Sequence, residues 1–152
     1  MQSFEILAEL DENVLNLLKI LKLKRDVVFE NEVKGMARRR IVMGFHEILK
    51  YLKSGRIKAV IVARNMNWQE EARRGLKNMC DVEKICVSQG IPLISASTKR
   101  ILGRILQKHP YISAIGIFDI SGYEEEFQKI LNLWKIDDAF KMYHLDQNSM
   151  FA

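Results

Sequence analysis

The sequence has few of the features that mark secreted or membrane proteins. It contains only two cysteines and two prolines in 152 residues, and no apolar run approaches the roughly 20 residues of a membrane-spanning helix. Cys80 and Cys86 have no neighbouring histidine pair, so they fit neither a zinc knuckle nor a disulfide framework, and we interpret both as reduced structural thiols. The first residues, MQSFEILAELDE, are acidic and do not resemble a signal peptide. We therefore expect a protein of the cytoplasm or the nucleus without a membrane span.

Catalytic motifs are also missing. The sequence contains no GxGxxG after a strand, no GxxxxGK[ST], no GxSxG and no HExxH. Its three histidines, His46, His109 and His144, are far apart and suggest no catalytic partner. The acidic triplet Glu124–Glu126 stands at the start of a predicted helix, where interaction with the helix dipole is a simpler explanation than metal binding. We expect no enzyme, no cofactor or metal, and no small-molecule substrate.

Acidic residues are scarce in two stretches of the chain. Residues 34–64 hold nine Lys or Arg and a single acid, Glu47, and residues 99–113 hold four Lys or Arg and no acid. The flanking segments, 1–33 and 114–152, are net acidic, although the whole chain has a formal charge of +5. One basic run alone is usually a solvated surface, but two acid-poor runs between acidic flanks favour contacts with phosphate.

Hydrophobic spacing predicts an N-terminal helix followed by an α/β domain. Behind Ser3, which can cap a helix, an apolar stripe at helical spacing predicts an amphipathic arm that packs into a core or, less simply, docks a partner. The charged residues 24–37 indicate a second helix that stops near Gly35. We divide the chain into a helical arm of residues 1–37 and a domain of residues 38–152. The stripe consists of Phe4, Leu7, Leu10, Val14, Leu17, Leu18 and Leu21.

The domain alternates strands and helices. This order predicts a three-layer α/β/α sandwich around a small, mostly four-stranded mixed sheet, with the N-terminal helical extension. Strands are expected at 41–43, 59–63, 91–96 and 113–118. Helices are expected at 44–53, closed by Ser54–Gly55; at 69–89, with a break near Gly75 and an end at Gly90; at 99–107, capped by Thr98; and from Tyr123 onward, with Phe127, Ile130, Leu131, Trp134 and Phe140 on the buried side.

The stretch 38–58, RRRIVMGFHEILKYLKSGRIK, carries the most functional information. Gly44 stands at the start of a short amphipathic helix, where a backbone without a side chain allows close approach and free N–H groups attract phosphate. Ile48, Leu49 and Leu52 should be buried, whereas His46, Lys50 and Lys53 should face solvent. The pattern indicates a nucleic-acid surface.

The segment GFHEILKYLKSGRIKAVIVARN resembles the signature of the kink-turn RNA-binding superfamily of ribosomal and small-ribonucleoprotein proteins, the L-seven-Ae type, whose usual pattern is Gly-x-Asn-Glu-x-x-Lys. Within it the chain is similar to the RNA-binding domain of proteins that bind the selenocysteine insertion sequence (SECIS). That likeness runs through RRRIVMG, EILKYLK, GIPLISASTKRILGRILQK, SAIGIFD and SGYEEEFQKIL. Three features distinguish it from the ribosomal members: the motif LGR followed by GIF, the longer segment 64–90, and a histidine, His46, where the usual pattern has Asn.

The resemblance implies roles for individual residues. Gly44 would let the RNA backbone approach, Glu47 would accept hydrogen bonds from a guanine edge in sheared G·A pairs, and Lys50 would meet phosphate; a simple helix-surface pair of Glu47 with Lys50 is the alternative. His46 replaces the usual asparagine but can still donate to a base or stack on one. The loop 108–112, with Pro110, would pack on a flipped-out nucleotide. The full set of expected RNA-binding residues is Arg38, Arg39, Arg40, Gly44, His46, Glu47, Lys50, Arg64, Lys99, Arg104, Lys108, Tyr111 and Ile112.

The function implied by the resemblance is binding of a SECIS element in selenoprotein mRNA, to support selenocysteine incorporation at UGA together with the ribosome and the selenocysteine-specific elongation factor. A ribosomal or small nucleolar ribonucleoprotein component that binds ordinary kink-turns is the first alternative. A protein-interaction module of the same fold is the second, although its acidic residues are absent from 34–64. We also expect RNA binding to survive deletion of residues 3–23.

Overall fold

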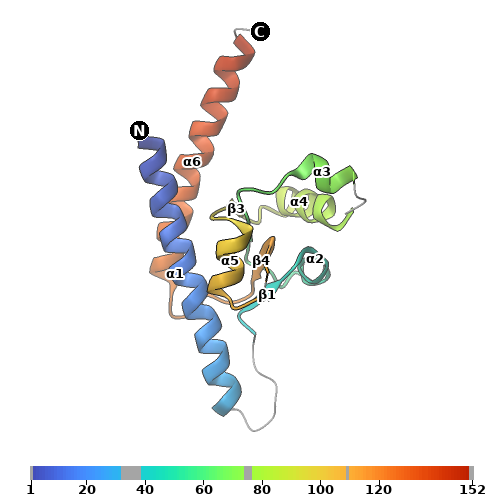
Figure 1. Cartoon of the computed structure of the whole chain (residues 1–152), viewed down its shortest axis with the longest axis vertical. Helices are drawn as coiled ribbons and strands as arrows, with labels where there is room; N and C mark the ends of the chain where they lie inside the picture. Colours follow the sequence, from blue (N-terminus) through green and yellow to red (C-terminus); the bar gives the residue numbers. More distant parts are fainter. Residues whose placement is uncertain (1, 32–38, 74–76, 109, 151–152) are drawn as a thin grey trace.

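The computed structural model describes residues 2–31, 39–73, 77–108 and 110–150 (Figure 1). Side chains are described for 4–23, 39–67, 69–70, 73, 77–108 and 110–139. The elements are α1 (Gln2–Asn31), β1 (Ile41–Met43), α2 (Phe45–Lys53), β2 (Ala59–Val62), α3 (Trp68–Arg73), α4 (Lys77–Gln89), β3 (Leu93–Ser95), α5 (Lys99–Ile105), β4 (Ala114–Ile117) and α6 (Glu124–Met150). Among these elements, no helix is both long and apolar enough to cross a membrane.

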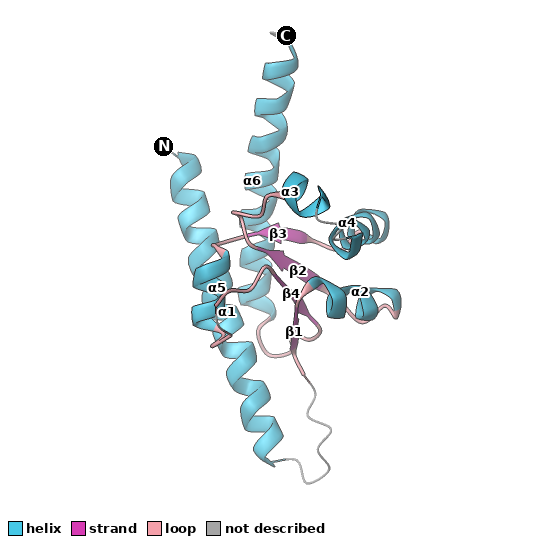
Figure 2. Ribbon diagram, turned by 45° about the vertical axis from the view of Figure 1, so that its right-hand side comes forward, coloured by secondary structure: helices cyan, strands magenta, loops and turns pink. Residues whose placement is uncertain are grey.

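The strands form one mixed sheet in the order β1-β4-β2-β3. β4 pairs antiparallel with β1 and with β2, and β2 pairs parallel with β3. All four residues of β2 and of β4 are buried, which explains their continuous apolar sequences. Helices α2, α3 and α4 lie on one face of the sheet, and α1, α5 and α6 lie on the other (Figure 2). The predicted α/β sandwich with a small mixed sheet is confirmed.

The N-terminal helix differs from the prediction. α1 runs without interruption to Asn31, so the expected second helix from residue 24 is wrong for the described residues, and Ser3 lies inside α1 rather than at its cap. No glycine or proline occurs in residues 24–31 to end the helix, and Gly35 lies outside the described residues.

Most of the predicted apolar stripe of α1 belongs to the core, but Phe4 at its start is 76% exposed and Leu7 is half-buried. Leu10, Val14, Leu17, Leu18 and Leu21 are each at most 2% exposed. α1 packs beside α6, with further contacts to α5 and β1 (Figure 1). Removing residues 3–23 would expose this core to water, so we expect the deletion to lower the stability of the domain. Survival of RNA binding after this deletion stays a prediction.

Local signals in the domain place the helix ends well. Thr98 caps α5 by accepting a hydrogen bond from the amide of Ile101, and Ser54 ends α2 before Gly55, whose φ is 72°. Gly90 follows α4 with a φ of 70°. α3 ends at Arg73 and α4 begins at Lys77, on either side of the expected break, but Gly75 itself and the side chain of Phe140 lie outside the described residues.

Candidate nucleic-acid interface

Four loops meet at one edge of the sheet: the loops that follow β1, β2 and β3, and the loop that precedes β4. Because β1, β2 and β3 run in one direction and β4 runs in the other, the carboxyl ends of the first three strands adjoin the start of β4. Hydrogen bonds between loops hold this edge together. The amide of Gly44 donates to the carbonyl of Ala114 (3.0 Å), and the amide of Ile112 donates to the carbonyl of Lys99 (3.0 Å). The amide of Lys99 in turn donates to Oδ1 of Asn65 (3.1 Å). The starts of α2 and α5 are thereby joined to the loops before β4 and after β2.

Gly44 opens the start of α2 to an approaching chain. Its φ of 92° and ψ of 146° lie where side chains are rarely tolerated, and no heavy atom lies within 4 Å of the position that a Cβ would occupy. No side chain caps α2 at Gly44. A phosphate or a base can therefore come close to this backbone, at the positive end of the helix dipole.

The polar residues of α2 lie next to this opening. His46 and Lys50 are exposed and Glu47 is half-buried. The carboxylate of Glu47 makes no hydrogen bond or ion pair with another residue in the described part of the chain, so the alternative pairing with Lys50 is not formed. Lys50 instead places its Nζ 5.4 Å from the centre of the Tyr51 ring. Glu47 keeps its acceptor oxygens available for a ligand with donor groups.

Two asparagines in this edge were not predicted from the sequence. Asn65 binds the amide of Lys99, and its position directly after a buried strand is the signal that could have indicated it. Nδ2 of Asn78, near the start of α4, lies 3.4 Å from Nδ1 of His46 and orients that ring. Nothing in the sequence around Asn78 distinguishes it from a solvated helix residue.

The described residues of the loop before β4, Lys108 and Pro110–Ile112, pack tightly against α5. A Cβ on Gly103 would lie 2.7 Å from the carbonyl oxygen of Lys108 and 2.8 Å from Cα of Tyr111, so only glycine lets the loop come this close. Tyr111 is 62% exposed, whereas Ile112 is only 5% exposed and belongs to the core. Tyr111 can therefore meet a base, and Ile112 supports the loop from inside.

A shallow cleft of about 350 Å³ lies against α5. The exposed Arg104, one of the expected RNA-binding residues, lines it, and the exposed Lys108 follows in the adjoining loop. The cleft combines two guanidinium groups with an apolar proline ring, a combination that suits a phosphate beside an unstacked base. Its lining residues are Arg100, Gly103, Arg104, Gln107 and Pro110.

Three expected residues lie away from this edge or face another way. Arg40 precedes β1 at the end opposite Gly44, and its Nη1 donates to the carbonyl of Ser121 (2.8 Å); the exposed Arg39 precedes it. Arg38 lies outside the described residues. Arg64 follows β2 at the correct edge, but its guanidinium faces α1.

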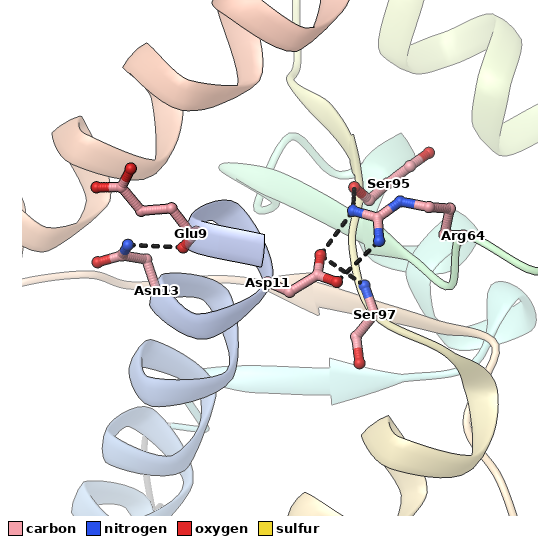
Figure 3. A network of polar contacts seen from close by, with 6 residues as sticks. All are labelled: Glu9, Asp11, Asn13, Arg64, Ser95 and Ser97. Carbon is pink, nitrogen blue, oxygen red and sulfur yellow. Dashed lines mark hydrogen bonds and ion pairs between the residues drawn. The ribbon is translucent and has the colours of Figure 1, made fainter. Parts of the chain in front are cut away.

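Arg64 is held by an acid from α1 (Figure 3). Its Nη1 and Nη2 donate to the two carboxylate oxygens of Asp11 at 2.8 and 2.6 Å, and Oδ1 of Asp11 also accepts from the amide of Ser97 (3.0 Å). The hydrogen bond to Asp11 raises the pKa of Arg64. Ser97 is 3% exposed and has a φ of 62°, so the carboxylate stabilises a strained turn between β3 and α5.

The comparison with known families covers most of the domain. Residues 27–126 match the model of the ribosomal protein L7Ae/L30e/S12e/Gadd45 family. The chain belongs to the L7Ae family. The matched residues include all four loops at the edge that holds Gly44 and Lys99. The fold agrees with that of the Giardia lamblia 15.5kD RNA binding protein, with a TM-score of 0.61 at 19% identity over 85% of this chain and 90% of that one.

The curated relatives with significant similarity are much longer proteins. Rat selenocysteine insertion sequence-binding protein 2 is 33% identical over 127 residues, which is 82% of this chain but 15% of that protein. Human selenocysteine insertion sequence-binding protein 2-like is 34% identical over 137 residues, which is 89% of this chain and 12% of that protein. This L7Ae-type chain thus spans less than a sixth of these relatives, and the likeness is one between domains.

Proposed function

We propose that this L7Ae-type domain binds kinked RNA, and that its target is a SECIS element in selenoprotein mRNA. The observation that carries the proposal is the half-buried carboxylate of Glu47, which has no partner among the described residues. In the sequence of α2 it comes three residues after the open backbone of Gly44 and three residues before Lys50. A lone acceptor among basic groups suits the donor edge of a guanine, while the surrounding cations suit the phosphates. The names of the 33–34% identical relatives support the choice of SECIS RNA.

The cellular role follows from the same proposal. A domain that holds a SECIS element would support selenocysteine incorporation at UGA during translation, with the ribosome and the selenocysteine-specific elongation factor as partners. Such a protein would work in the cytoplasm, and in the nucleus if it meets its mRNA there. The chemistry at this edge is that of binding, and we propose no catalytic step.

The direct test is RNA binding with two variants that should fail in different ways. Glu47→Ala should lose about 1–3 kcal/mol for a SECIS stem with intact G·A pairs and almost nothing for a stem in which those pairs are replaced by Watson–Crick pairs. Lys50→Ala should weaken the binding of both RNAs and reduce the slope of log K against log salt by about one. If both variants bind both stems like the parent, the site is misplaced.

Binding of ordinary kink-turns in a ribosomal or small nucleolar particle is the second candidate. The match of the fold to an RNA binding protein of 15.5 kD favours it. Competition decides between the two: a minimal kink-turn should displace a SECIS stem poorly if SECIS RNA is the target, and equally well if it is not. A protein-interaction module is disfavoured by the acid-poor segment 34–64.

A further inference from the structure

An exposed basic stripe continues beyond the proposed site along α2. His46, Lys50 and Lys53 are exposed and stand four and three residues apart, so they lie on one side of the helix. The nine residues of α2 span about 13.5 Å, from the Gly44 edge to the opposite end of the sheet. After the turn at Gly55 the exposed Arg56 follows.

The ring of Tyr51 contacts two cations of this stripe, Lys50 and Arg56. Nζ of Lys50 lies 5.4 Å and Cζ of Arg56 lies 5.3 Å from the centre of the Tyr51 ring. Arg56 also lies 5.4 Å from the Phe118 ring, and the two rings meet edge to face with centroids 4.8 Å apart. Contacts with two rings restrict the guanidinium of Arg56 before any ligand binds, which lowers the entropic cost of binding.

Two further cations lie at the same end of the sheet as Arg56. Arg40 and the exposed Lys58 lie at the same end of the sheet, since the amide of Phe118 donates to the carbonyl of Arg40 and the amide of Lys58 donates to that of Ile117. The nearby acid is Asp119, whose Oδ1 already accepts from the hydroxyl and the amide of Ser121 at 2.6 and 2.9 Å. Those bonds, together with the charges of Arg40 and Lys58, lower the pKa of Asp119. We name Arg40, Lys53, Arg56 and Lys58 the far-end cluster.

Packing alone explains part of this arrangement. The stem of an arginine covers apolar surface in many proteins, and stacking on rings stabilises a fold. It does not explain why Arg40 and Lys58 lie close enough to Asp119 to lower its pKa, nor why Arg56 is joined to Lys50 through one shared ring. Within the described residues, Arg56 makes no ion pair.

We propose that the far-end cluster binds the phosphates of the RNA stem that continues from the bend held at Gly44–Lys50. This inference rests on the proposed function. The length of α2 corresponds to about five phosphates along one strand of an A-form stem, so the stem must extend roughly five base pairs past the bend to reach Arg56. A shorter stem would leave the cluster empty.

The test compares one RNA with a long stem and the same RNA with that stem cut to two base pairs. Arg56→Gln should weaken binding of the long-stem RNA about 3- to 10-fold and reduce its salt slope by about 0.7–0.9, without changing binding of the short-stem RNA. Lys58→Gln, which removes a cation without touching the rings, should act in the same direction. Lys129→Gln on α6, also exposed, is the matched control and should change neither RNA.

If Arg56→Gln and Lys58→Gln bind both RNAs as tightly as the parent protein does, the inference is overturned. Equal losses of affinity for the long-stem and the short-stem RNA would overturn it as well. Glu47→Ala separates this failure from failure of the proposed function. If Glu47→Ala loses affinity for the stem with intact G·A pairs but not for the stem with replaced pairs, only the far-end contact is wrong; if it loses affinity for neither stem, the proposed function fails as well.

Discussion

The carboxylate of Asp11 and the guanidinium of Arg64 form a two-point ion pair with N–O distances of 2.6 and 2.8 Å, although 53 positions separate the two residues in the sequence. Asp11 belongs to α1 and Arg64 follows β2. The side chains are 26% and 33% exposed. The same carboxylate holds the Ser97 amide, just before Lys99, so α1 fixes a turn at the proposed RNA-binding edge.

Replacing Asp11 by Asn should lower the free energy of unfolding by about 1–2 kcal/mol, between the values for exposed ion pairs and for hydrogen bonds to buried charged groups. The change removes the charge opposite Arg64, whose buried Nε already has no partner in the described structure. Urea unfolding measures the effect. Glu9→Gln, at an exposed position of the same helix, should be neutral, and an equally neutral Asp11→Asn would mean that the pair does not stabilise the fold.

The buried stripe of α1 gives a second prediction. Leu18→Ala should cost about 2–5 kcal/mol because the side chain is fully buried and its removal leaves a cavity. Leu23→Ala, two positions after the stripe ends and 63% exposed, should stay within about 0.5 kcal/mol of the parent. Thermal and urea unfolding of both variants test this. Similar losses for the two would show that α1 is not packed as described.

Two glycines that are both buried should respond differently to a methyl group. Gly103→Ala should cost about 1–3 kcal/mol and weaken RNA binding, because the added Cβ meets backbone atoms of the loop 108–111. In Gly116→Ala the Cβ meets the ends of the Ile57, Val42 and Ile48 side chains, which can move. We expect the second loss to be the smaller one in urea unfolding. The reverse order would contradict the described loop packing.

The two free cysteines should differ in reactivity. Burial raises the pKa of the Cys86 thiol to about 11, so below that pH the folded protein holds it as the unreactive thiol. At pH 8, iodoacetamide should modify the half-buried Cys80 first and Cys86 only after denaturation, as followed by mass spectrometry. Because the folded-state pKa is raised, the thiol form favours the folded state, and this contribution is lost as the pH rises towards 11. Simultaneous modification of both thiols in the native protein would refute the assignment.

His46 offers a test of RNA preference. Replacing it with Asn restores the usual pattern of the superfamily, so binding of a simple kink-turn should improve relative to binding of a SECIS stem. The substitution also replaces the imidazole that contacts Asn78 with a shorter amide side chain. Affinities for the two RNAs measured in parallel give the answer, and equal changes would count against His46 as a discriminating residue.

The sequence predicted elements well where the signal was local. Gly44, Thr98 and Ser54–Gly55 marked helix ends through backbone and capping preferences that act within a few residues. The apolar runs of β2 and β4 were recognisable because both strands are buried on both faces. The sequence also predicted that His46, Glu47 and Lys50 lie on α2 and that Lys99 begins α5, and the starts of both helices lie at the same edge of the sheet.

Non-local relationships could not be obtained in this way. The strand predicted at 41–43 already separates Arg40 from Gly44, but the charge pattern treats 34–64 as one basic surface, and only the sheet shows the two residues at its opposite ends. The partner of Arg64 is Asp11, 53 positions earlier, and no periodicity links them. Similarly, Ile112 and Tyr111 are neighbours in sequence, but only the path of the loop over Gly103 decides which one faces solvent.

The strand order also constrains how this chain acquires its structure. β1 pairs only with β4, so Ile41 has no partner strand until Ile117 has been synthesised. The stripe of α1 likewise stays exposed until α6 follows. Contacts between such distant segments slow folding, because a long loop must close before any pairing energy is gained. During translation the emerging N-terminal half therefore presents an uncovered row of leucines to chaperones, and the sheet forms only after its central strand has left the ribosome.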